Sequence, residues 1–213
     1  MRTRKYGWQS EIPPTSCSYL VPYVLRKLQA LKARCVFDLG AGNGALCRAL
    51  LANGFEVVGM EPDEEGARFA RANALGIRIY ELTVEDDPVA ILADWPGQFD
   101  VVVSTEVIEH LYAPDCLPNF ARALIRPGGV LLITTPYHGY IKNLVISLFG
   151  KWDQHADPLV TGGHIKFFSR RTISALLERC GYEVVAFSGV GRIPFLWKSM
   201  VVTARQRQEA SHR

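Results

Sequence analysis

The sequence lacks several features that would place it in a specialised class of protein. No apolar run approaches the ~18 residues that a membrane-spanning helix needs. The basic N-terminus, M-R-T-R-K-Y-G-W-Q-S, is not followed by the apolar stretch of a secretory signal. The five cysteines are scattered and form no C-x-x-C pair, which argues against a zinc site or a disulfide framework. We therefore expect reduced thiols and a cytoplasmic location.

Charge of one sign is also scarce, and there is no internal repeat. The net charge is +3, and no stripe of Lys and Arg is interleaved with aromatic residues, so we expect no nucleic-acid partner. What is present is a chain of 213 residues that is 48% hydrophobic and 21% charged. That length and composition suit a single α/β domain with a buried core.

The most informative stretch is V-F-D-L-G-A-G-N-G, Val36 to Gly44. Its apolar half predicts a buried parallel strand, and Ala45–Ala52 predicts the following helix. Between them lie Gly40, Gly42 and Gly44. Glycine permits the sharp turn and the close approach of a ligand because it has no Cβ. A strand, a glycine turn and a helix N-terminus are typical of a nucleotide site, although a tight turn without a ligand is the simpler alternative.

The loop itself narrows the choice of ligand. It lacks the Gly-Lys-Ser/Thr ending of a P-loop, but it fits G-x-G-x-x-A, so a dinucleotide has to be considered. Asp38, two residues before the first glycine, argues against a pyrophosphate because the two negative charges would repel. A carboxylate there suits the ammonium group of S-adenosylmethionine, which carries no phosphate.

D-L-G-A-G-N-G resembles the glycine-rich motif of the class I S-adenosylmethionine-dependent methyltransferases, and R-P-G-G-V-L-L-I, from Arg126, resembles a second motif of this family. Glu61 lies 21 positions after Gly40, close to the spacing of an acid that binds ribose hydroxyls. Asp63 is expected to cap the next helix instead. The family contacts adenine in the loop T-V-E-D-D, often through an Asp where this chain has Thr83. The resemblance therefore assigns cofactor contacts to Asp38, Gly40, Gly42, Gly44, Glu61, Val84, Glu85 and Thr105.

The pattern of strands and helices predicts an α/β fold. Further strands are expected at Glu56–Met60, Ile77–Leu82, Phe99–Ser104 and Val130–Thr135. Strands alternating with helices predict a doubly wound, mostly parallel sheet. The resemblance adds a closing β-hairpin from 183–188 and 198–203, which gives a Rossmann-like seven-stranded sheet of order 3-2-1-4-5-7-6. Ser18–Leu31 predicts a helix over the sheet edge, with Tyr19 or Tyr23 closing over the cofactor as the alternative.

The resemblance implies one domain over residues 1–213. Its expected parts are an N-terminal cap (1–35), a cofactor-binding core (36–135), a substrate lid (136–168), a final helix with the hairpin (169–204) and a polar tail (205–213).

A chemical constellation follows the fourth strand in T-E-V-I-E-H, where Glu106, Glu109 and His110 stand at i, i+3 and i+4. One helical turn would put all three on one face, where they could bind a metal ion or act as a general-base pair. The alternative is a helix N-terminus with solvated acids and a histidine that is hydrogen-bonded to the backbone. E-x-x-E-H resembles the motif of the ubiquinone-pathway O-methyltransferases, which implies a Mg²⁺ site at Glu106, Glu109 and His110, with His110 and Glu109 catalytic. We expect His110 to keep its proton beside two acids, which favours the metal over a base.

The segment Pro136–Lys166 is too long for a simple connection and predicts an insertion. We assign contact with the methyl acceptor to Tyr137, His138 and His164. Ile141, Leu144, Val145, Leu148 and Phe149 form the apolar stripe of a short helix. This helix is expected either to pack on its own domain or to serve as a lid, with residues 139–150 touching a membrane surface.

These observations predict a methyltransferase that uses S-adenosylmethionine and acts on a small molecule. O-methylation of a phenolic, quinol-like acceptor in ubiquinone biosynthesis is the expected reaction, and N- or C-methylation of another metabolite is the alternative. An NAD-binding oxidoreductase and a catalytically silent cofactor-binding subunit are weaker alternatives. The oligomeric state is left open.

Overall fold

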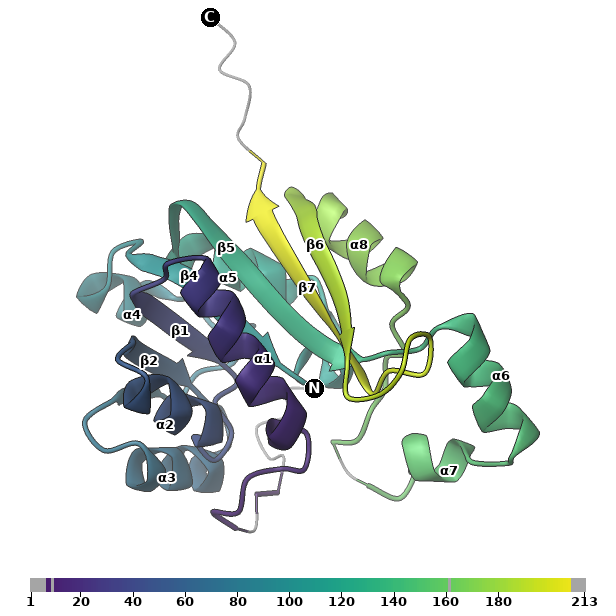
Figure 1. Ribbon diagram of the computed structural model, residues 1–213. Coiled ribbons are helices and arrows are strands. Elements are labelled where there is room, and N and C mark those ends of the chain that lie inside the picture. The colour runs from purple at the N-terminus through teal and green to yellow at the C-terminus, as the bar shows by residue number, and fades with distance from the viewer. Residues whose placement is uncertain (1–6, 9, 161, 208–213) are drawn as a thin grey trace, which may run out of the picture.

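The computed structural model describes residues 7, 8, 10–160 and 162–207, and these form one mixed sheet flanked by helices (Figure 1). Within the described residues the sheet has seven strands in the order β3-β2-β1-β4-β5-β7-β6. β7 runs antiparallel to β5 and β6, and the other pairs are parallel. The predicted topology is confirmed. The strands are β1 (Cys35–Leu39), β2 (Glu56–Met60), β3 (Arg78–Tyr80), β4 (Phe99–Thr105), β5 (Ile125–Pro136), β6 (Tyr182–Val190) and β7 (Ser199–Gln206).

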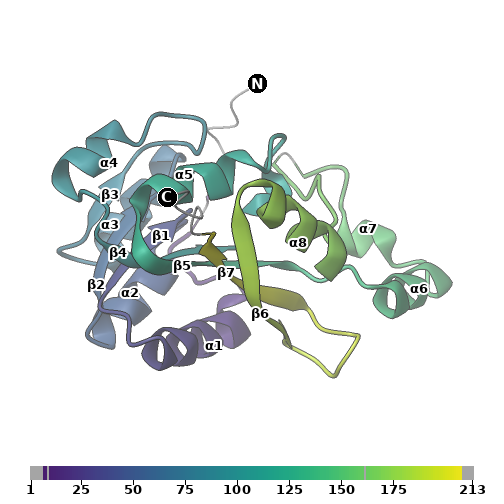
Figure 2. The same ribbon diagram turned by 90° about the horizontal axis from the view of Figure 1, so that it is seen from above.

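Helices cover both faces of this sheet, as the view from above shows with α1 and α2 on one side and α4, α5 and α8 on the other (Figure 2). The helices are α1 (Cys17–Ala30), α2 (Ala45–Ala52), α3 (Glu64–Asn73), α4 (Val89–Asp94), α5 (Cys116–Leu124), α6 (Tyr140–Leu148), α7 (Trp152–His155) and α8 (Arg170–Arg179). Neighbouring residues of β1 point to opposite faces, so Val36 packs with α1 and α2 while Phe37 packs with α4 and α5. This two-sided burial explains why the strands are almost entirely apolar.

Local sequence signals set most of the element ends. Asp63 caps α3 as predicted, because its side chain accepts from the backbone N–H groups of Glu65 and Gly66. Ser169 and Thr172 form a capping box at the start of α8. α1 covers the sheet through Leu20, Val24 and Leu28. The Tyr19 hydroxyl lies 3.1 Å from Ser199 Oγ, at the sheet.

Several predicted boundaries were wrong. β3 is shorter than the predicted strand 77–82. β5 begins at Ile125 instead of Val130, because the Arg-Pro-Gly-Gly turn lies inside an irregular stretch of the strand. β7 continues to Gln206 and so includes the first residues of the predicted tail. Residues 208–213 of that tail lie outside the described part of the chain. α4 and α7 were not predicted.

The insertion between β5 and α8 holds α6 and α7 and lies at one end of the molecule (Figure 1). α6 does not bury its apolar stripe. Ile141, Leu144, Leu148 and Phe149 are exposed, whereas Lys142 and Ile146 are buried. Lys142 Nζ donates to the Lys198 carbonyl at 3.1 Å, which fixes this face of the helix to the start of β7. Among the described residues no helix is long and apolar enough to cross a membrane.

Candidate active site

The glycine loop after β1 is folded back onto β2. The backbone N–H groups of Gly40 and Ala41 both donate to the Met60 carbonyl at 2.9 Å. Gly44, at the start of α2, has a φ of +78°, and a Cβ on it would lie 2.7 Å from Ala70 Cα in α3. Glycine is therefore required here both by the left-handed backbone and by the close packing of α2 on α3.

A cavity of about 240 Å³ opens beside this loop at the carboxyl ends of β1, β2 and β4. Ligands of open α/β sheets bind at this edge. Six of the predicted cofactor residues line it, namely Gly40, Gly42, Glu61, Val84, Glu85 and Thr105. Asp38 and Gly44 are not among its described lining residues. Trp8, Asn43 and Leu111 also line the cavity, and sequence reasoning did not select them.

Asp38 is buried beneath the glycine loop, with 1% of its surface exposed. Its Oδ2 accepts a hydrogen bond from the Cys47 thiol at 3.1 Å, and its Oδ1 has no partner among the described residues. Burial raises the pKa of Asp38 from 3.8 to about 7. A buried carboxyl with one unpaired oxygen is suited to a cationic group.

Glu61 ties the glycine loop to the end of β2. Its Oε2 accepts from the Gly42 N–H at 2.8 Å and its Oε1 from the Asp63 N–H at 3.0 Å. Each carboxylate oxygen keeps a second lone pair, so Glu61 can still accept from a ligand hydroxyl. Burial raises its pKa to about 7.

The loop after β3 is held in place by Asp86, which the sequence reasoning did not single out. The Asp86 carboxylate accepts from the Thr83 N–H at 2.8 Å and from the Thr83 hydroxyl at 3.0 Å. The resembling family often has an Asp at the position of Thr83. In this chain Thr83 is hydrogen-bonded to the nearby Asp86. Thr83, Val84 and Glu85 all line the cavity.

The segment Glu106–His110 does not form the expected helical face. Glu106 has a left-handed backbone (φ +54°), and only Ile108–His110 forms a short 3₁₀ turn, η1. The Glu106 carboxylate turns toward the sheet, where it accepts from Thr134 Oγ1 at 2.8 Å and Ser199 Oγ at 3.1 Å. The grouping of Glu106 with Glu109 and His110 on one helix face was therefore wrong, because Glu106 has a left-handed backbone and lies before the short turn that begins at Ile108.

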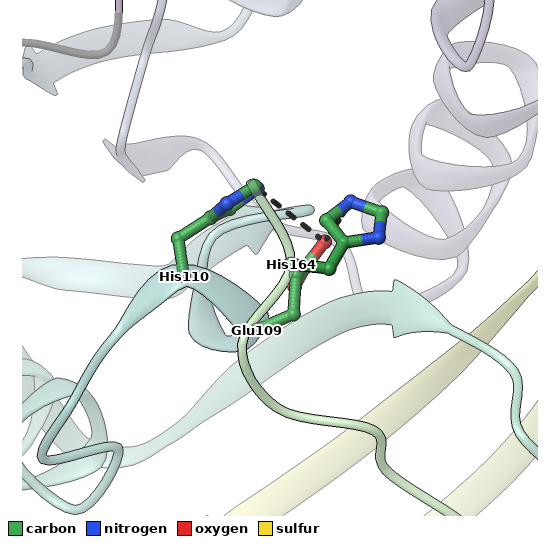
Figure 3. Close-up of side chains that lie close together, drawn as sticks. All are labelled: Glu109, His110 and His164. Atoms are coloured by element: carbon green, nitrogen blue, oxygen red, sulfur yellow. Dashed lines mark ion pairs between the residues drawn. The ribbon is translucent and has the colours of Figure 1, made fainter. Parts of the chain in front are cut away.

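His164, from the insertion, stands where Glu106 was expected (Figure 3). Glu109 Oε1 lies 3.9 Å from His110 Nε2 and 4.0 Å from His164 Nε2. One atom from each of the three side chains lies within 4.8 Å of the others, close enough to share a metal ion. The Glu109 carbonyl accepts from the N–H groups of Ile165 and Lys166, both at 3.0 Å, which holds His164 against η1.

The hydrogen bonds of this cluster fix its protonation. Glu109 Oε2 accepts from Thr135 Oγ1 at 2.9 Å, while Oε1 is buried with no described partner. His110 Nδ1 lies 2.6 Å from the Gly162 carbonyl oxygen. A carbonyl can only accept, so Nδ1 carries the hydrogen and the neutral ring has its lone pair on Nε2. Burial lowers the pKa of His110, so the expectation that it keeps its proton was wrong: desolvation outweighs the hydrogen bonds to the Gly162 and Gly163 carbonyls.

Tyr137 packs against the segment between β6 and β7, and His138 packs against Phe167. Tyr137 meets Trp197 edge-on with ring centroids 5.1 Å apart, and His138 meets Phe167 edge-on at 4.9 Å. Burial lowers the pKa of His138 to about 4. Neither residue is among the described lining of the cavity. His164 alone of the three predicted acceptor residues reaches the cluster.

Comparison with known proteins agrees with the fold. A family model described as "Methyltransferase domain" matches residues 14–186. The chain belongs to this family, the class I S-adenosylmethionine-dependent methyltransferases.

Two curated relatives are similar over most of the chain. A ubiquinone biosynthesis O-methyltransferase of Bordetella avium is 33% identical over 165 residues, which cover 76% of this chain and 67% of that protein. The enzyme of the same name from Vibrio parahaemolyticus is 31% identical over 178 residues, covering 79% and 72%.

Solved structures share the fold. Magnesium protoporphyrin IX methyltransferase from Synechocystis, with bound SAH, has a TM-score of 0.63 at 19% identity and covers 88% of this chain and 82% of that one. A 1,6-didemethyltoxoflavin-N1-methyltransferase of Burkholderia thailandensis has a TM-score of 0.64 at 19% identity, covering 88% and 77%.

Proposed function

We propose that this enzyme transfers the methyl group of S-adenosylmethionine to a phenolic oxygen of a small, quinol-like acceptor, with a divalent metal ion held by Glu109, His110 and His164. The observation that carries the proposal is the position of this cluster. His110 belongs both to the cluster and to the lining of the cavity beside the glycine loop. The names of the curated relatives support the same class of acceptor.

The cofactor would lie across the carboxyl ends of the strands. Glu61 would accept from the ribose hydroxyls, and Val84 and Glu85 would contact adenine. The methionine end would lie near Gly40 and Thr105, with its ammonium closest to the buried Asp38. Methyl transfer is an in-line displacement, so these residues act mainly by holding the methyl group in line with the acceptor.

The residues of the cluster fit a metal ion. Glu109 Oε1 is buried and has no hydrogen-bond partner among the described residues. The Nε2 atoms of His110 and His164 lie 3.9 and 4.0 Å from this oxygen. The carbonyl of Gly162 orients His110 from behind, as outer partners of metal-binding histidines do. One carboxylate and two imidazoles favour a first-row transition ion over the Mg²⁺ that the resemblance implied, because Mg²⁺ prefers oxygen ligands.

A phenol is mostly protonated at neutral pH and needs help to react. A bound divalent ion would lower the pKa of an acceptor hydroxyl that it coordinates. The chain itself keeps His110 neutral through burial and keeps Glu109 aligned through Thr135. Glu106 is set back from the cluster but lines the cavity, where its carboxylate can meet a polar group of the acceptor.

An acceptor with an apolar tail would approach from a membrane, and α6 supplies a surface for it. Tyr140, Leu148 and Phe149 are 82%, 73% and 70% exposed, and Ile141 and Leu144 are partly exposed beside them. Lys151 follows this surface, where it could meet anionic headgroups. We propose that residues 139–150 rest on the membrane surface while the cofactor cavity stays in water.

Two measurements test the proposed reaction. Calorimetric titration with S-adenosylmethionine and with NAD should show binding of the former alone. Transfer of a labelled methyl group should then be followed over a panel of catechols, carboxylic acids and amines. We expect label on the catechols. Label on amines or carbon, with none on the phenolic oxygens, would replace this proposal with N- or C-methylation, and no transfer to any acceptor would favour a silent cofactor-binding subunit.

A further inference from the structure

Trp8 lies beside the glycine loop although it is far from that loop in sequence. Its side chain lines the 240 Å³ cavity. The preceding residue is fixed to the same region, because the Gly7 N–H donates to Asp63 Oδ2 at 2.9 Å. Asp63 is the capping residue of α3, two positions after Glu61. The indole is thus held next to the acid proposed to bind ribose.

Two glycines leave room for the indole. A Cβ on Gly66 would lie 2.6 Å from Trp8 Cδ1, and a Cβ on Gly42 would lie 2.8 Å from Trp8 Cη2. Gly66 stands in the first turn of α3 and has no left-handed backbone, so φ does not require glycine there. Glycine within a helix is destabilising relative to alanine. The close approach of Trp8 explains why glycine occupies position 66, because any larger residue would collide with the indole.

Asn43, the polar residue of G-A-G-N-G, anchors the chain that follows Trp8. Its side-chain amide donates to the carbonyls of Ser10 at 3.3 Å and Ile12 at 2.9 Å, and only 1% of its surface is exposed. Asn73 of α3 in turn donates to the Asn43 carbonyl at 2.8 Å. The glycine motif therefore uses its asparagine side chain to hold residues 10 and 12.

We infer that Trp8 is a cofactor-binding residue: its indole walls the ribose edge of the cavity beside Glu61 and slows the release of the bound cofactor. The inference rests on the proposed cofactor site. Trp8 Nε1 and Glu61 Cγ both lie 3.0 Å from the Cβ position of Gly66, so the ring and the acid are neighbours. An aromatic ring there can contact the apolar face of the sugar while it shields the hydrogen bonds of Glu61 from water.

The test compares Trp8→Ala and Trp8→Phe with the wild type, using S-adenosylhomocysteine as the probe. Calorimetry gives the dissociation constant and stopped-flow displacement gives the dissociation rate. We expect Trp8→Ala to weaken binding roughly three- to tenfold, mainly through faster dissociation, and Trp8→Phe to retain most of the affinity. Intrinsic fluorescence should change on binding in the wild type and in Trp95→Phe, a control away from the cavity, and should change much less in Trp8→Phe.

The outcomes separate this inference from the proposed function. If the wild type binds the probe and both Trp8 variants bind it with unchanged affinity and rate, Trp8 is not part of the site, and the cofactor site stands. If the wild type itself does not bind the probe, the cofactor site fails and the role of Trp8 with it. Because Trp8→Phe keeps an aromatic ring, its fluorescence result decides the question even if Trp8→Ala folds poorly.

Discussion

Cofactor affinity should depend strongly on pH, because two buried carboxyl groups of the site have raised pKa values. Burial raises the pKa of both Asp38 and Glu61 to about 7 in the free protein. If S-adenosylmethionine binds the ionised forms, lowering the pH from about 7.5 to about 6 weakens binding about eightfold for one such group and about 70-fold for two. Affinity therefore falls as the pH falls through 7.

Calorimetry in buffers of different ionisation enthalpy measures both the affinity and the protons released. At about pH 6 nearly two protons should leave the protein on binding, and Glu61→Gln should reduce this to about one. The comparison should stay below about pH 7.5, because the amino group of the cofactor titrates near pH 8. Equal affinity at both pH values, with no dependence on the buffer, would show that neither carboxyl meets the cofactor in its charged form.

Three further predictions concern single residues. Asp38→Asn should raise the free energy of unfolding by at most about 4 kcal/mol at neutral pH, because the raised pKa means that ionised Asp38 costs stability. In urea titrations this gain in stability should grow between about pH 4 and pH 7, and a gain at pH 3 would contradict the prediction. Gly40→Val should abolish cofactor binding in calorimetry, since Gly40 has a φ of +85° and its Cβ would meet Val107; unchanged affinity would place the site elsewhere. Asp86→Ala should weaken S-adenosylmethionine but not methionine, because Asp86 holds the loop after β3; equal losses for both ligands would remove that loop from the adenine site.

Most of the fold was predictable because short-range signals and the resemblance agreed. The apolar strand before Gly40 and the helix after it follow from hydrophobic pattern and glycine chemistry, and β2 has the predicted bounds Glu56–Met60. The orientation of α6 was not predictable in this way. Its apolar stripe was compatible with packing on the domain and with an exposed lid. Lys142 is buried because its ammonium reaches a carbonyl at the start of β7.

The candidate site was predictable only where its residues share a local motif. Gly40, Gly42 and Glu61 follow from spacing along the βαβ unit, and all three line the cavity. The grouping of Glu109 and His110 with His164 depends on a contact across more than 50 positions, between the carbonyl of Glu109 and the N–H groups after His164. Helical periodicity predicted Glu106 as the third member of the cluster. It assumes a regular helical backbone, whereas Glu106 has a left-handed one.

The metal dependence of methyl transfer tests the central claim most directly. Turnover of a catechol acceptor should be measured before chelation, after chelation, and after adding back Mg²⁺, Mn²⁺ or Zn²⁺, in the wild type, in His164→Ala and in His155→Ala. His155 is a matched control from the same insertion, outside the cluster. We expect the activity of the wild type and of His155→Ala to disappear with the chelator and to return with a divalent ion. The activity of His164→Ala should stay low throughout, although its affinity for S-adenosylmethionine should be unchanged. Full turnover in the chelated enzyme and in His164→Ala would contradict a metal site at Glu109, His110 and His164.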